Sequence, residues 1–185
     1  MTTALLLIDI QTGFDAPVWG PRNNPGAEDN AARLLAHGRA VGWEICHVFH
    51  NSVDPDSPLR GDGTGFKPQV KPKSHERVFE KSVNAAFIGT PLLPHLREIG
   101  ATQLVICGLT TPHCVSTTAR MAGNLGFLSH VIHDACAAFA GNADTGWAGP
   151  DAPALSPEVM HYVALSHLHG EFVAVRSTAD MITRG

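Results

Sequence analysis

Short, continuous apolar runs alternate along this chain with segments of helical spacing, and this alternation restricts the folds open to it. The first run, residues 4–8, is apolar at every position and ends at Asp9. Continuous runs are typical of strands covered on both faces, whereas strands with one wet face alternate polar and apolar residues. The same reasoning predicts further strands at residues 44–49, 78–79, 104–107, 128–133 and 172–175.

The segments between these runs have apolar residues at helical spacing. They predict helices at residues 28–42, 91–99, 115–126, 158–168 and 177–183. Gly42 can end the first helix, and Thr90 and Ser156 are expected N-caps. Strand and helix in repetition predict an α/β fold of three layers, α-β-α, with a six-stranded, mostly parallel sheet.

Length and charge narrow the function classes. The 185 residues fit a single domain spanning 1–185. Charged residues make up 16% of the chain, below the usual ~25%, which leaves surface for subunit contacts. We therefore expect a homo-oligomer, a dimer or tetramer, with a weakly charged monomer as the alternative. The formal net charge is −4, and without a basic run we expect no nucleic-acid partner.

Targeting signals and cysteine usage both favour a cytoplasmic location. Residues 1–9 have no positive region of the kind that opens a signal peptide. No apolar stretch approaches the ~18 residues of a membrane span, so we expect no membrane association and a cytoplasmic location. The four cysteines form no Cys-x-x-Cys pair, so a disulfide framework is not expected. Each cysteine is a small buried hydrophobe unless its context says otherwise.

Cys114 has such a context. An apolar strand ends at Gly108, a tight connection follows, and Cys114 stands where a helix begins. Unpaired N–H groups and a partial positive charge at a helix N-terminus lower the pKa of a thiol. The same N–H groups can hold an oxyanion. Position alone leaves two interpretations open, a nucleophile and a structural thiol.

Two further residues are predicted at the carboxyl edge of the sheet, where open α/β sheets bind ligands. Asp9 closes the first strand and could act as a general base. The alternative is an aspartate that caps a turn. Lys81 follows the third strand and could hold a thiolate or carboxylate by charge. Taken alone, Lys81 could equally be a solvated surface lysine.

Three motifs in series resemble the isochorismatase-like cysteine hydrolases. The first is Leu-Leu-Ile-Asp-Ile-Gln at residues 6–11, followed by Phe14. The second is Phe-Glu-Lys-Ser at 79–82, with Ala-Phe at 86–87 and Gly-Thr-Pro-Leu at 89–92. The third is Val-Ile-Cys-Gly at 105–108, then Thr111, Cys-Val at 114–115, Thr-Ala at 118–119 and Gly126. Their order and spacing match over nearly the whole chain.

The resemblance implies a catalytic triad of Asp9, Lys81 and Cys114. It also implies a sheet order of 3-2-1-4-5-6, in which the chain reverses between the strands that carry Asp9 and Cys114. A cis peptide bond is implied between Leu109 and Thr110. That bond would aim the Thr110 N–H, together with the Cys114 N–H, at an oxyanion.

The intact cysteine favours hydrolysis of a small amide or carbamoyl C–N bond through a thioester. Isochorismate-type cleavage of a vinyl ether needs no sulfur nucleophile, and it is kept as an alternative. A non-catalytic member that binds a small ligand is a second alternative. An unrelated flavodoxin-like binder would need a glycine-rich phosphate loop after the first strand, and residues 11–15 supply none.

The substrate pocket is harder to predict. Two irregular stretches, residues 50–74 and 137–155, are read as walls or lids. The pocket residues that we expect are Gln11, Phe14, Trp19, His50, Phe87, His113 and Trp147. Trp147 could instead come from a neighbouring subunit. Structural roles are expected for His133, Asp134, His167 and His169.

No cofactor and no catalytic metal are predicted. The metal-dependent nicotinamidases of this superfamily carry an Asp-x-His motif with a further histidine after the second strand. Here residues 47–54 read His-Val-Phe-His-Asn-Ser-Val-Asp, without an Asp-x-His. Two histidines three residues apart hold a metal only where carboxylates converge on them.

Overall fold

The computed structural model describes residues 2–184, and these form one sheet of six parallel strands. The spatial order is β3-β2-β1-β4-β5-β6. The predicted fold class and strand order are therefore confirmed. The strands are β1 (Thr2–Ile8), β2 (Glu44–His50), β3 (Arg77–Lys81), β4 (Ala101–Leu109), β5 (Leu128–Ala137) and β6 (Ala174–Arg176).

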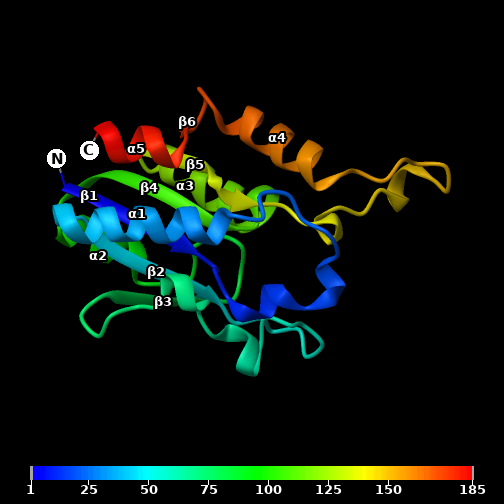
Figure 1. Ribbon diagram of the computed structural model, residues 1–185, viewed down its shortest axis with the longest axis horizontal. Coiled ribbons are helices and arrows are strands. Elements are labelled where there is room, and N and C mark those ends of the chain that lie inside the picture. The colour runs from blue at the N-terminus through cyan, green and yellow to red at the C-terminus, as the bar shows by residue number, and fades with distance from the viewer. Residues whose placement is uncertain (1, 185) are drawn as a thin grey trace.

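Helices cover both faces of the sheet (Figure 1). Helices α1 (Ala27–Val41) and α5 (Thr178–Arg184) pack together on one face. The other face carries α2 (Leu92–Glu98), α3 (Ser116–Asn124) and α4 (Pro157–Leu168). The sheet is thus buried on both sides, as the continuous apolar runs predict.

The caps predicted at Gly42 and Ser156 are confirmed, whereas the N-cap of α2 is Pro91 and not Thr90. Gly42 ends α1 in the left-handed conformation, with φ of 79°. The Ser156 hydroxyl accepts the Val159 N–H at 3.3 Å at the start of α4. The Thr90 hydroxyl accepts the Leu92 N–H at 3.3 Å, and α2 begins at Leu92 itself. The Ser156 hydroxyl thus pairs one of the backbone donors that a helix start leaves free.

Strand ends differ from the prediction in every strand, and three of the differences bear on the site or its surroundings. β3 includes Lys81 as its last residue, whereas the apolar pair at 78–79 marks only its centre. β5 continues past His133 to Ala137, because Cys136 and Ala137 still pair with Gly108 and Leu109 of β4. Within this extension the Asp134 carboxylate accepts the N–H and hydroxyl of Thr178 at 2.8 Å each. That pairing confirms the structural role expected for Asp134. β6 begins two residues later than predicted, at Ala174.

The end of β1 is fixed by a close approach from β4. A side chain at Gly108 would place its first carbon 2.0 Å from the Ile8 carbonyl oxygen, and Gly108 has φ of 126°. Only glycine fits there. The residue that follows β1, Asp9, has a φ of 51°, a conformation that aspartate tolerates better than most residues. The chain reverses its order here, between β1 and β4, and the side chain of Asp9 lies at that edge.

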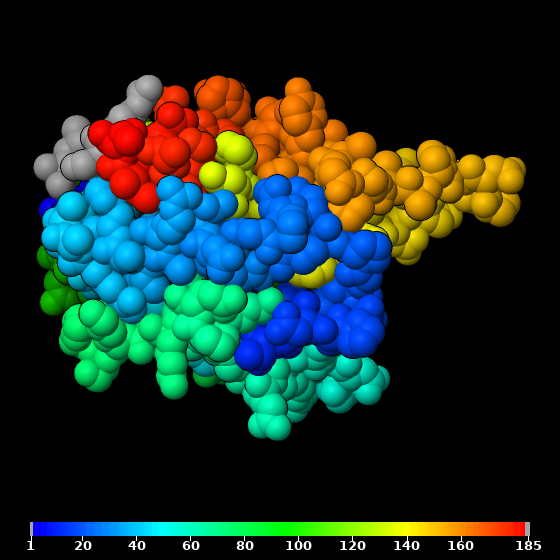
Figure 2. Space-filling model, viewed as in Figure 1, coloured from blue at the N-terminus to red at the C-terminus, as the bar shows by residue number. Residues whose placement is uncertain are grey.

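One segment stands away from the body of the protein. Residues 143–155 extend as an arm beyond the end of the sheet (Figures 1 and 2). Trp147 in this arm is 88% exposed. Among residues 2–184, no helix is both long enough and apolar enough to cross a membrane.

Candidate active site

Asp9, Lys81 and Cys114 meet at the carboxyl edge of the sheet. Asp9 follows β1, Lys81 ends β3, and Cys114 lies in η5 (Thr111–Val115), a single wide helical turn between β4 and α3. The Lys81 ammonium is 2.7 Å from Asp9 Oδ2 and 3.3 Å from Cys114 Sγ. The side chains of Asp9 and Lys81 are fully buried. The three residues named from the sequence are therefore in contact.

The Lys81 ammonium has a third neighbour. His50 Nδ1 lies 3.1 Å from Lys81 Nζ. An ammonium has three N–H donors and no acceptor, so the carboxylate, the sulfur and the imidazole account for all three. Nδ1 of His50 is then an acceptor, and its ring proton sits on Nε2. Burial first, and then the Lys81 charge, lower the pKa of His50 to about 4, which keeps the ring neutral.

The thiol of Cys114 is protonated at rest. Burial, and then the charge of Asp9, raise the pKa of Cys114 above its ordinary value. The lowered thiol pKa expected from the helix N-terminus is therefore wrong, because desolvation outweighs the partial charge of one helical turn. Burial also raises the pKa of Asp9, although Lys81 opposes that shift. A carboxylate with a raised pKa is a stronger base for the thiol proton.

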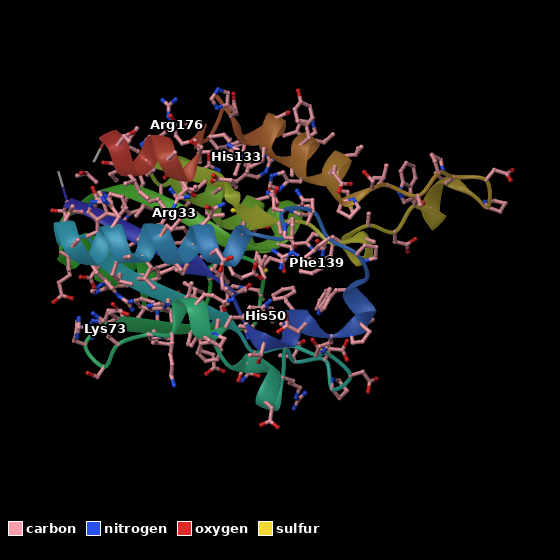
Figure 3. The ribbon with its side chains drawn as sticks, in the orientation of Figure 1. Arg33, His50, Lys73, His133, Phe139 and Arg176 are labelled. Atoms are coloured by element: carbon pink, nitrogen blue, oxygen red, sulfur yellow. The ribbon has the colours of Figure 1, made fainter. Side chains whose placement is uncertain are left out.

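A pocket of about 170 Å³ opens over Cys114. The predicted residues Phe14, Trp19, His50 and His113 line it. His50 and Phe139 lie at the same end of the sheet, beside the segment that follows β1 (Figure 3). Four residues that were not predicted also line it: Ser57, Leu59, Asn84 and Asn142. Three of these come from the two irregular stretches read as walls, but no local pattern there marks which side chains turn inward.

Two predicted pocket residues lie elsewhere. Phe87 packs in the core, where its ring stacks on Phe127 at 6.3 Å between centroids. Its motif led us to expect this ring in the pocket, whereas the fold buries it in the hydrophobic core. Trp147 lies in the exposed arm and does not line the pocket of its own chain. A role for Trp147 in a neighbouring subunit stays a prediction.

Gln11 also does not line the pocket; it supports a residue that does. Its amide oxygen accepts the His50 N–H at 2.8 Å, and its amide nitrogen donates to the His50 carbonyl at 2.9 Å. Gln11 is fully buried. This pair of bonds extends the pairing of β2 by one step and holds the backbone of His50, whose ring contacts Lys81.

Gln11→Leu is expected to lower the free energy of unfolding by about 1–3 kcal/mol, because the N–H and carbonyl of half-buried His50 lose their hydrogen-bond partner. Urea denaturation measures the change. Gln103→Leu is the matched control, since Gln103 is half-buried and accepts only a 3.3 Å bond from Thr3 at the other end of the sheet. Equal losses in the two variants would contradict the supporting role of Gln11.

A hydrogen bond connects η5, the turn that carries Cys114, to α4. His161 Nδ1 lies 2.8 Å from the Thr111 hydroxyl, one residue after the Leu109–Thr110 peptide bond. That bond is cis, as the resemblance implies. Burial, and then the charge of His133, lower the pKa of His161 to about 4. Burial and His133 therefore both favour a neutral His161 ring in the folded protein.

The free energy of unfolding is expected to fall as the pH drops from 6.5 to 4. In this window the unfolded chain protonates His161 while the folded chain does not, so the unfolded state binds more protons. His50 has the same shift and adds to the slope. Chemical denaturation at several pH values measures it, and His161→Gln is expected to flatten it. Parallel curves for wild type and variant would count against the neutral ring.

A metal ion would compete with Lys81 for this site. The ligand atoms of Asp9, His50 and Cys114 lie within 4.8 Å of one another, yet the ammonium already contacts all three. The other histidine of the 47–54 segment, His47, is buried and pairs with Glu76 at 3.0 Å. It therefore lies outside the site, because residues three apart on a strand face opposite ways.

A family model described as the isochorismatase domain matches residues 3–180. The chain belongs to the isochorismatase family. This isochorismatase-family protein is 42% identical over 181 residues to the isochorismatase family protein YrdC of Bacillus subtilis, covering 97% of this chain and 94% of that one. An isochorismatase-family protein of known structure from Chromobacterium violaceum has a TM-score of 0.91 at 41% identity, covering 98% and 92% of the two chains.

A more distant relative is named for its activity. Maleamate amidohydrolase from Pseudomonas putida is 29% identical over 153 residues, covering 71% of this chain and 70% of that one. The family match confirms the resemblance argued from the three motifs, and it supports a hydrolase.

Proposed function

We propose that this protein hydrolyses the C–N bond of a small amide or carbamoyl compound, with Cys114 as nucleophile. One observation carries the proposal. A fully buried lysine ammonium contacts both a carboxylate and a thiol at the floor of a pocket. The ammonium stabilises the carboxylate before proton transfer and the sulfur charge after it, so the proton can move without a large change in local charge.

The reaction begins when Asp9 takes the thiol proton of Cys114. The sulfur attacks the amide carbon, and the N–H groups of Thr110 and Cys114 hold the resulting oxyanion. The C–N bond then breaks, and Asp9 returns the proton to the leaving nitrogen. Removal of one oxyanion donor typically costs about 2.7–4 kcal/mol in other hydrolases.

A water molecule completes the cycle. Asp9 takes a proton from the water as the water oxygen attacks the thioester carbon. The C–S bond then breaks, and the proton restores the Cys114 thiol. The product acid leaves, and Lys81 keeps its protons throughout. Asp9 therefore acts twice as base and twice as acid, which the raised pKa of this carboxyl favours.

Trapping the thioester tests this function. Wild-type protein is incubated with a panel of small amides, with and without hydroxylamine, and both ammonia and hydroxamate are measured. We expect an amide that releases ammonia and yields hydroxamate when hydroxylamine is present. Ammonia release without hydroxamate, at hydroxylamine levels that trap a model thioester, would exclude the covalent route. Cleavage of a vinyl ether but of no amide would favour the isochorismate-type alternative.

A further inference from the structure

The pocket over Cys114 has one apolar wall. Phe14 and Trp19 form it with 4.9 Å between ring centroids, and Leu59 adjoins them. The indole N–H of Trp19 is already donated to the Gly13 carbonyl at 2.9 Å. Trp19 therefore offers a ligand its ring surface and no free donor. A flat group can pack against such a wall.

The rest of the lining is largely polar and uncharged. It contains Ser57, Asn84 and Asn142 together with the rings of His50 and His113. Burial lowers the pKa of both histidines, so both rings are neutral near pH 7. Of the ten described residues that line the pocket, none is Lys, Arg, Asp or Glu.

The nearest cation, the Lys81 ammonium, has no free donor for a ligand. The Lys81 ammonium lies behind Cys114, and its three donors are held by Asp9, His50 and the sulfur. An anion in the pocket would lose its hydration without gaining an ion pair, which is costly. The volume of about 170 Å³ also lies below the ~300–1,000 Å³ of pockets for drug-sized ligands.

We propose that this site selects small, uncharged, flat amides and rejects amides that bear a carboxylate. The proposal rests on the proposed function, because it names the substrate class of the same site. The substrate lies with one face on the Phe14–Trp19 wall, and its remaining polar atoms meet neutral donors and acceptors. This would set the protein apart from its relative that is named for maleamate, an anionic amide.

Alkylation of Cys114 tests the charge selectivity without any knowledge of the substrate. Iodoacetamide and iodoacetate have nearly the same size but differ by one negative charge. In either reaction the S–C bond forms, the C–I bond breaks, iodide leaves, and Asp9 passes the thiol proton to water. The alkylation rate of the protein is measured by mass spectrometry of the intact chain. Each rate is then divided by the rate at which glutathione reacts with the same reagent. Cys46, Cys107 and Cys136 are fully buried, and Cys114→Ala reports any labelling of them.

We expect Cys114 to prefer iodoacetamide over iodoacetate by at least about tenfold more than glutathione does. Ser57→Lys, which adds a cation to the polar part of the lining, is expected to remove most of that preference. Ser74→Lys, at an exposed position outside the pocket, is the matched control and should keep it. A preference equal to that of glutathione, or no reaction with either reagent, would overturn the proposal.

A pair of amides then separates this proposal from the proposed function. (Z)-But-2-enamide and maleamate differ by a methyl group in place of a carboxylate. Faster ammonia release from the neutral amide supports the selectivity. Equal or faster release from maleamate overturns the selectivity and leaves C–N hydrolysis intact. If neither amide nor any other member of the panel is cleaved, the proposed hydrolysis fails, and the alkylation ratio still decides the charge preference.

Discussion

Cys114→Ala is expected to lower kcat by at least about 10⁴-fold, in line with the loss of a nucleophile in other triad hydrolases. Cys114→Ser should lose nearly as much. The serine hydroxyl is a weaker acid than the thiol, and Asp9 is too weak a base to ionise it. Both variants are expected to change the free energy of unfolding by only about 1 kcal/mol. The measurement is steady-state hydrolysis of the best amide, with urea denaturation beside it.

The control for this prediction is another buried thiol. Cys136 is fully buried in β5, and burial raises its pKa to about 12. Cys136→Ala removes the same atoms and should leave kcat within about threefold of wild type, because the change lies in packing alone. Residual activity in Cys114→Ala close to that of wild type would mean that another group attacks the substrate. A large loss in Cys136→Ala would show that the assay reports folding.

Lys81→Met is expected to lower the free energy of unfolding by about 3–5 kcal/mol at pH 7, since it leaves the buried Asp9 carboxylate without its partner. Asp9→Asn should also destabilise, because the Lys81 ammonium then loses its counter-charge. The double variant Asp9→Asn/Lys81→Met removes both charges and should be more stable than the sum of the single losses predicts. All three variants should lack activity. Urea denaturation of the four proteins gives the coupling between the two residues.

The pH dependence sharpens this prediction. Without Lys81, Asp9 loses the charge that opposes the effect of burial, and its pKa in the folded state rises further. The unfolded chain then releases its proton at a lower pH than the folded chain does, so the cost of Lys81→Met should shrink as the pH falls. Arg33→Met removes an exposed cation and is expected to cost less than about 0.5 kcal/mol at any pH. A cost of Lys81→Met that is constant with pH would contradict the pairing.

The sequence by itself determined the layers of the fold and the three residues of the proposed triad. Residues 4–8 are too apolar to face water on either side, so the strand had to be central and Asp9 had to lie at its end. Lys81 and Cys114 could be named because each sits at a fixed distance from a strand end within a recognisable motif. These properties are local in the chain, which is why they can be read from it.

Only the tertiary structure decided how the site works. The pKa of Cys114 depends on how deeply the thiol is buried, and no local pattern records that depth. His50 and Gln11 acquired their roles because β2 lies next to β1 and β3, which brings three distant segments together. The burial of Phe87 in the core and the exposure of Trp147 outside the pocket likewise depend on the folded chain. Charge, tautomer and pocket shape depend on neighbours in space, so they are fixed only when the chain has folded.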